Sequence, residues 1–348
     1  MSASSRARDW VARYGVGAAL AALALVAAVF VPGFFGLENL STILLHVSVN
    51  GILALGLTFV IVTGGIDLSV GSVVGLAGVF AAAALTGSGV LRAVGVAGAT
   101  ILAVGVALGT GAAVGAANGA ATAGLRIAPF IVTLATMTIA RGAARLFTAG
   151  VPIGFPAADD LLFATKARAL DALHAVGGGR IPLPGLARGF PVPALIMLAL
   201  VAAGAFVLER TRFGRYLYAV GGNEEAARLS GVPVAAVKLG AYAICGLCGG
   251  VAAVLLTGQL RSAGPDAGLL YELNAIAAAV IGGASLLGGV GTAWGALVGA
   301  LFIGVLNNAL DLVGVQSFWQ EIAKGIIILL AVLFDVWTKR ARGASRHA

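Results

Sequence analysis

Long apolar runs constrain the fold of this chain more than any other feature of its sequence. Several runs reach the length of about 20 residues that a helix needs to cross a bilayer. Only 10% of the residues are charged, whereas a soluble domain carries about 25%. In lipid, only helices and closed barrels satisfy every backbone hydrogen bond. Because the runs do not alternate polar and apolar residues with a period of two, they exclude barrel strands. The sequence therefore predicts an all-α polytopic membrane protein.

We expect about ten transmembrane helices in one transmembrane domain, residues 1–348. The predicted spans are 16–32, 41–63, 70–86, 93–121, 127–148, 191–208, 237–257, 273–288, 292–312 and 321–338. No clear cleavage site follows the first run, so an uncleaved first helix is favoured over a signal peptide. Lys and Arg are more frequent on the side that holds both termini, which predicts cytoplasmic termini.

Two long segments between spans are too polar or too interrupted to cross the membrane. Residues 149–190 hold Pro152 and Pro156 and are predicted to form the largest extracytoplasmic loop. Residues 209–236 are predicted to be cytoplasmic. The net charge of +8 does not indicate nucleic-acid binding, because the basic residues stand at the ends of apolar segments rather than on one soluble face.

Glycines recur at a spacing that favours close helix packing. Two rows have four-residue spacing: Gly111, Gly115 and Gly119, and Gly291, Gly295 and Gly299. Such rows let helix backbones approach one another in lipid. In addition, "GGIDLSVG" and "GGASLLGG" share the pattern Gly-Gly-x-x-Leu-x-x-Gly, which is weak support for an internal repeat of the kind found in transporters.

The cysteines and histidines do not indicate redox or metal chemistry. Cys245 and Cys248 lie one helical turn apart inside an apolar run, where we expect them to be small packing residues. The three histidines are scattered and show no metal-ligand spacing. We expect no catalytic site and no metal site in this chain.

The cytoplasmic segment contains the sharpest local signal, "AVGGNEEAARLSGVP". Asn223 is a good N-cap, and Glu224 and Glu225 follow it in the first turn, near the positive end of the helix dipole. Gly231 and Pro233 then stop the helix. We predict a helix of about two turns displayed at the membrane surface. It could fit the groove of a partner, or simply order a surface loop.

The chain resembles the permeases of bacterial ABC importers in the ribose, xylose and branched-chain amino-acid group. "GGNEEAARLSGV" is similar to the coupling-helix segment of these permeases. "TGGIDLSVGS", "RIAPFIVTLATMTIARG", "YELNAIAAAVIGGASLLGG" and "GVLNNALDLVGV" resemble the sugar permeases, ribose permeases most closely. The resemblance runs from about Asn39 to Phe334, with its motifs in order, and residues 159–190 match least well.

The resemblance implies a homodimer of permeases in the bacterial cytoplasmic (inner) membrane. A separate cytoplasmic ATPase, carrying ATP and Mg²⁺, would bind the coupling helices, and a periplasmic or lipid-anchored solute-binding protein would dock outside. The coupling residues would be Gly221, Gly222, Asn223, Glu224, Glu225, Ala226, Ala227, Arg228 and Gly231. Independently of the resemblance, the sequence contains no Gly-Lys dipeptide and hence no G-x-x-x-x-G-K-[ST] phosphate loop. The chain is thus expected to be a transport subunit, not an enzyme.

A sugar has hydroxyls and no charge, so its path needs amides, hydroxyls and at most a carboxylate. The candidates are Asn50, Thr58, Asp67, Ser69, Asn118, Thr133, Thr136, Glu272, Asn274, Asn307 and Asn308. Ionisable residues inside a membrane are costly and usually functional. Glu272 and Arg141 are expected near the ends of spans, where this cost falls. For the Asn and Thr residues, hydrogen bonding between helices is the competing interpretation.

Asp67 is expected where the second span meets the third, at the cytoplasmic side. There it would cap the third span by accepting an amide hydrogen bond from Ser69 or Val70. A gate or a substrate contact is the alternative role.

The leading hypothesis is a monosaccharide permease that works by alternating access. A branched-chain amino-acid ABC permease is the alternative within the resemblance. A secondary transporter driven by an ion gradient, or a structural membrane protein, is the alternative outside it.

Overall fold

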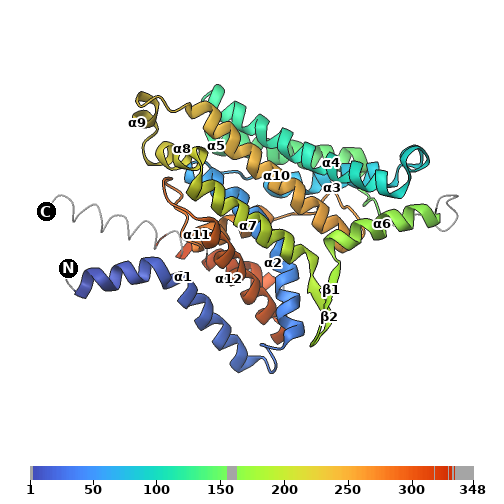
Figure 1. Ribbon diagram of the computed structural model, residues 1–348, viewed down its shortest axis with the longest axis horizontal. Coiled ribbons are helices and arrows are strands. Elements are labelled where there is room, and N and C mark those ends of the chain that lie inside the picture. The colour runs from blue at the N-terminus through green and yellow to red at the C-terminus, as the bar shows by residue number, and fades with distance from the viewer. Residues whose placement is uncertain (1–2, 155–162, 317, 328, 331–332, 334–348) are drawn as a thin grey trace.

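A computed structural model describes residues 3–154, 163–316, 318–327, 329–330 and 333, and it is mostly helical (Figure 1). The first half of the chain contains α1 (Ala3–Phe30), α2 (Leu37–Val62), α3 (Val70–Thr86), α4 (Ser88–Gly124), α5 (Pro129–Thr148) and α6 (Phe163–Gly177). The second half contains β1 (Arg180–Leu183), β2 (Leu186–Pro191), α7 (Val192–Arg210), α8 (Arg212–Gly222), α9 (Glu224–Leu229), α10 (Val234–Leu260), α11 (Tyr271–Ile281) and α12 (Ala293–Val313).

Six of the described helices are long and apolar enough to cross a bilayer: α2, α4, α5, α7, α10 and α12. Three shorter apolar helices, Gly15–Phe30, α3 and α11, accompany them. A mostly helical fold with several helices able to cross a membrane is therefore confirmed, while ten spans, cytoplasmic termini and an internal repeat stay predictions. The predicted span 321–338 lies partly outside the described residues.

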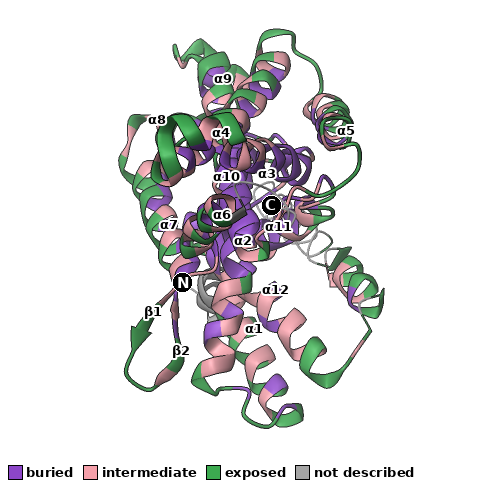
Figure 2. Cartoon of the chain, turned by 90° about the vertical axis from the view of Figure 1, so that its right-hand side faces the viewer, coloured by how far each residue is buried: buried purple, intermediate pink, exposed green. Residues whose placement is uncertain are grey.

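The buried core is centred on α2, α3 and α10, whose ribbons carry most of the fully buried residues (Figure 2). The helix α2 is buried over most of its apolar length, whereas most of α5 is exposed or half-buried. In lipid, apolar side chains need no covering, so an exposed apolar helix face carries no penalty there.

Most glycines of the two predicted rows pack directly against neighbouring backbone. On α4, a Cβ at Gly111 or Gly115 would overlap backbone of α10 around Gly246. On α12, a Cβ at Gly295 or Gly299 would overlap backbone of α11 at Gly282 and Ala278. The prediction of close packing through small residues is confirmed.

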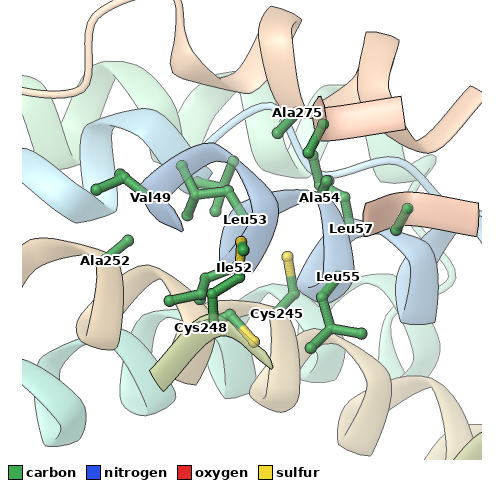
Figure 3. Packing of buried hydrophobic residues seen from close by; sticks show 14 of the residues in the cluster. Val49, Ile52, Leu53, Ala54, Leu55, Leu57, Cys245, Cys248, Ala252 and Ala275 are labelled. Carbon is green, nitrogen blue, oxygen red and sulfur yellow. The ribbon is translucent and has the colours of Figure 1, made fainter. Parts of the chain in front are cut away.

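Cys245 and Cys248 are buried free thiols on the face of α10 that packs against α2 (Figure 3). A Cβ at Gly56 of α2 would lie only 2.8 Å from the Cβ of Cys248. The two cysteines are packing residues, as their sequence context predicted.

The helices α3, with 17 residues, and α11, with 11 residues, are short because the chain before or after them leaves helical geometry. Residues 63–69 separate α2 from α3, and residues 261–270 separate α10 from α11. The predicted span 273–288 is wrong, because α11 ends at Ile281 and residues 282–292 form a turn. Gly283, Gly288 and Gly289 take positive φ in that turn, a conformation that favours glycine.

The two long predicted loops lie at opposite ends of the bundle (Figure 1). One end carries α8 and α9, and the other carries α6 with the β1–β2 hairpin. The strictly all-α expectation therefore needs one correction, since residues 180–191 pair as an antiparallel hairpin, with Gly185 at positive φ in its turn. The hairpin is anchored on α2, where Ser41 donates a hydrogen bond to the Gly189 carbonyl at 3.1 Å.

Candidate functional site

A buried polar cluster surrounds the start of α3. Asp67 and Ser69 are both essentially inaccessible to solvent. One carboxylate oxygen of Asp67 accepts a hydrogen bond from the Ser69 amide at 2.9 Å and another from the Ser69 hydroxyl at 2.6 Å. Because the amides at a helix N-terminus lack partners within the helix, a carboxylate is stabilised at this position.

The cluster continues into two neighbouring helices. Asn118 of α4 donates to the Ser69 hydroxyl at 2.9 Å, and Thr136 of α5 donates to the Asn118 side-chain oxygen at 2.7 Å. Four residues proposed from the sequence as pathway candidates therefore form one continuous chain of hydrogen bonds. Such interhelical hydrogen bonds satisfy polar groups that lipid cannot.

The backbone just before Asp67 is held as well. The Ile66 carbonyl accepts hydrogen bonds from the Tyr242 hydroxyl of α10 at 3.2 Å and from Thr133 of α5 at 3.4 Å. Thr133 also bonds within its own helix, to the Pro129 carbonyl at 2.9 Å. The segment 63–69 is thus fixed from two sides despite having no regular structure.

Asp67 lies where α2 meets α3 and accepts the expected hydrogen bond, while its position at the cytoplasmic side stays a prediction. Its carboxylate lies beside Cys245, about 16 Å along α10 from Val234 at a rise of about 1.5 Å per residue. After α2 ends, the chain turns back into the bundle before α3 begins. Asp67 accepts the Ser69 amide as predicted, but Ser69, not Asp67, directly precedes α3.

Glu272 lies on the other side of the α3 N-terminus. The residue is 7% exposed, and its Oε2 atom has no hydrogen-bond partner among the described residues. A Cβ at Gly71 would overlap this oxygen, so the carboxylate lies directly against the first turn of α3. Glu272 stands in the first turn of α11, near a helix end as expected, but its side chain is buried there. Two carboxylates flank one helix start.

The remaining candidates do not join this cluster. Asn50 of α2 and Asn307 of α12 each have a buried side-chain oxygen without a partner among the described residues. Asn308 exchanges two 3.0 Å hydrogen bonds with Asn39. Thr58 bonds to the Ala54 carbonyl of its own helix, and Asn274 lies half-buried on α11.

Two site residues were missed by the sequence reasoning. Tyr242 is fully buried in α10, and its hydroxyl reaches the Ile66 carbonyl. Thr122 of α4 is buried, and its hydroxyl has no partner among the described residues. A single tyrosine in an apolar run gives no sign of its partner, although buried Tyr hydroxyls generally find one.

The short helix α9 has the ends that the sequence predicted. Asn223 accepts the Ala226 amide at 2.9 Å as the N-cap, and Gly231 has a φ of 82° just after the helix. It is shorter than the predicted two turns, with only six residues. Ala227 faces inward and is buried, while Leu229 is 82% exposed and projects away.

One ion pair joins α9 to α10, and a second lies within α9. Glu224 bonds to Lys238 at 2.6 Å and to Arg228 at 3.0 Å. The hydrogen bond from Lys238 lowers the pKa of the Glu224 carboxyl, and partial burial opposes this shift. Together these contacts keep the short helix in one orientation.

A groove of about 660 Å³ lies between this surface and the connection from α4 to α5. Its lining includes Arg126, Arg228, Lys238 and Glu224. Three cations and one acid make the groove electropositive, which suits an acidic group of a partner.

Shortened apolar helices that begin next to buried polar groups are typical of membrane transporters. The chain belongs to the family described as branched-chain amino acid transport system / permease component, whose model matches residues 39–332.

Curated relatives match most of the chain. The ribose import permease protein of Haemophilus influenzae is 41% identical over 317 residues, covering 91% of each chain. That of Bacillus subtilis is 44% identical over 313 residues, covering 90% of this chain and 89% of its own. The L-arabinose transport system permease protein of Escherichia coli is 36% identical over 343 residues, covering 98% and 95%. No solved structure matches.

Proposed function

We propose that this chain is the membrane-spanning permease subunit of an ABC importer for a monosaccharide, with ribose as the first candidate. Identity of 41–44% to ribose import permeases over about nine tenths of the chain carries this proposal. The relatives that transport arabinose and xylose support a simple sugar as substrate. The family description also names branched-chain amino acids, which are the second candidate substrates.

The proposed assembly is a homodimer in the bacterial inner membrane, with about ten spans and cytoplasmic termini. A separate ATPase binds the surface of α9 on the cytoplasmic side and supplies ATP and Mg²⁺. A solute-binding protein delivers the sugar at the end that carries α6 and the hairpin. The exposed Leu229 and the electropositive groove beside α9 are the docking features that support this arrangement.

The polar cluster at the start of α3 suits a neutral solute. Its amide and hydroxyl groups can exchange hydrogen bonds with sugar hydroxyls, while Asp67 is already occupied by Ser69. Asn50 and Asn307 offer further acceptor oxygens that lack partners among the described residues. We propose that Asn50 and Asn307 line the solute pathway, which alternating access opens to one side of the membrane and then to the other. The other proposed pathway residues are Ser69, Asn118, Thr133, Thr136, Glu272 and Asn274.

The contact between α8 and the α2 end provides a route from the ATPase to this pathway. Gly221 lies against the Val62 carbonyl and the Gly289 amide. The Tyr218 hydroxyl donates a 2.7 Å hydrogen bond to the Gly291 carbonyl. A displacement of α8 and α9 would therefore reach the end of α2 and the turn before α12.

Reconstitution into liposomes tests the proposal. The permease, the ATPase and the solute-binding protein encoded beside its gene are purified, and uptake of radiolabelled ribose, arabinose, xylose and leucine is measured. We expect accumulation of one sugar only with ATP inside and the binding protein outside. Uptake that continues without ATP would sink the proposal in favour of ion-driven transport, and uptake of leucine alone would replace the sugar with an amino acid.

A further inference from the structure

The segment 261–270 runs inward along α3 and does not cross the outer surface as an ordinary loop. It follows the glycine face of α3, passing Gly78, then Gly75, then Gly71. A Cβ at Gly78 would lie 3.9 Å from the Ala263 side chain, and a Cβ at Gly75 would lie 2.9 Å from the Ala267 carbonyl oxygen. A Cβ at Gly71 would overlap the Gly268 carbonyl oxygen. The chain therefore descends by about 10 Å, the length of seven helical residues.

Arg141 of α5 holds this segment by its backbone. The Arg141 side chain is 9% exposed, and its Nη1 atom donates to the Pro265 carbonyl at 2.7 Å and to the Ala267 carbonyl at 2.8 Å. One turn further along α5, Arg145 forms a 2.7 Å ion pair with Asp266 that is more than half exposed. Three consecutive residues of the segment are thus bound by two arginines: Arg141 from inside the protein and Arg145 from its surface.

The held segment covers a carboxylate oxygen that has no hydrogen-bond partner among the described residues. Glu272 follows two residues after the segment, and both its Oε2 atom and the Gly268 carbonyl oxygen would overlap a Cβ at Gly71. The Arg141 guanidinium is also its electrostatic neighbour. A buried carboxylate oxygen without a hydrogen bond is costly, so the closed arrangement requires other contacts to hold it shut.

The same helix contacts the other irregular segment too. Thr133 donates to the Ile66 carbonyl of segment 63–69, but only at 3.4 Å. The helix α5 is packed mainly on α3 and α4, and much of its apolar surface is exposed. It is therefore the lightly packed element that hydrogen-bonds both irregular segments.

We propose that Arg141 is a positioning residue for transport. It holds segment 261–270 against α3, and movement of α5 releases the segment and uncovers Glu272 for the solute. This inference rests on the proposed function for its solute, but the closure itself is a property of this chain alone.

Thiol labelling tests the closure without any transport assay. Val74 is 1% exposed and lies beneath Gly268, so Val74→Cys reports whether the segment is lifted. The reporter is placed in a background in which Cys245 and Cys248 are replaced by alanine, and the purified protein is labelled with a maleimide in detergent. The test variant is Arg141→Gln. Its matched control is Arg145→Gln, which removes a cation from the same face of the same helix.

Loss of two hydrogen bonds from a charged donor should raise the labelling rate of the reporter thiol about tenfold or more in Arg141→Gln. Arg145→Gln should change this rate by less than about twofold, because its ion pair is exposed. Arg141→Lys should give an intermediate rate, since lysine keeps the charge but its side chain is one bond too short to place the ammonium at the Nη1 position. Equal rates in Arg141→Gln and the parent would overturn the proposal.

A variant that fails to fold would also label fast, because its reporter thiol would be exposed by unfolding. Each variant must therefore elute as a single species before it is labelled. If Arg141→Gln fails this check, Arg141→Lys carries the test against Arg145→Lys. Uptake measured on the same variants separates the two proposals. Labelling that rises in a chain that transports no sugar refutes the proposed function alone, whereas unchanged labelling in a working sugar importer refutes the positioning role alone.

Discussion

The amide of Gly289 donates a 2.9 Å hydrogen bond to the carbonyl of Val62 and so joins the turn before α12 to the end of α2. The two glycine motifs that resemble each other in the sequence meet at this point. A Cβ at Gly288 would lie 2.9 Å from the Gly64 amide. Because the two motifs pack closely here, Gly288 has no room for a side chain, and this steric reason for glycine does not depend on an internal repeat.

Gly221 is expected to tolerate no side chain at this junction. In Gly221→Ala the new methyl group would overlap the Val62 carbonyl, so α8 must shift and ATP-driven uptake should fall strongly. Gly222→Ala is the matched control, because no atom lies within 4 Å of the Cβ position there. Uptake and ATPase rate of the reconstituted complex are the measurements. Equal activity of the two variants would refute a role for the close contact.

Thr136 should stabilise the protein through its bond to Asn118. Thr136→Val removes this 2.7 Å interhelical hydrogen bond and should cost about 0.5–1.5 kcal/mol. Thr138→Val, two residues away, removes a bond only to the Ala135 carbonyl of the same helix and should cost less than about 0.5 kcal/mol. Unfolding in detergent by a denaturant series gives both values. A larger loss for the Thr138 variant would contradict the network.

Asp67 should tolerate asparagine but not alanine if capping is its main role. The Asn side-chain oxygen can accept the Ser69 amide as the carboxylate does, so Asp67→Asn should retain near-normal uptake. Asp67→Ala removes the acceptor and should reduce both stability and uptake. Complete loss of uptake in Asp67→Asn, with intact folding and assembly, would instead assign Asp67 to the solute or to a gate.

The Glu224 carboxyl should make the stability of the α9 region depend on pH. Its pKa is lowered below the ordinary value of 4.5, mainly by the hydrogen bond from Lys238. A depressed pKa contributes stability above the unfolded value, and this contribution is lost as the pH falls through the folded value. The wild-type chain should therefore be more stable than Glu224→Gln at neutral pH, and the difference should shrink below about pH 4.5.

Glu225→Gln provides the control for this measurement. Glu225 is 71% exposed, and its contact with Arg228 is 4.0 Å long. Its replacement should leave the pH profile of thermal unfolding unchanged. If the two variants gave the same profile, the pair with Lys238 would contribute nothing measurable.

Local signals were the most accurate part of the sequence-based prediction. The ends of α9 follow from Asn223 and Gly231 alone, because capping involves residues within one turn of each other. The long helices follow from hydropathy. The turn 282–292 could not be separated from a span, because "GGASLLGG" contains no charge that would mark it as leaving the helix.

Long-range pairings were beyond the sequence. The hydrogen-bond network of Asp67, Asn118 and Thr136 depends on how α3, α4 and α5 pack. The residue pattern of each helix does not predict that packing. The inward course of residues 261–270 was missed for the same reason. Arg141 donates to backbone carbonyl groups there, and every residue type carries such a carbonyl, so the sequence does not indicate the partner.

The glycine contact between α4 and α10 has a mechanical consequence. Where Gly115 meets Gly246, backbone touches backbone and no side chains are present to interlock in a new register. Shear between packed helices proceeds by small sliding steps in which side chains repack. The helices α4 and α10 have no side chains there that could repack, so they should move as one rigid body throughout the transport cycle. Motion must then be carried by elements packed on this pair, and α5, which packs mainly on α3 and α4, is one of them.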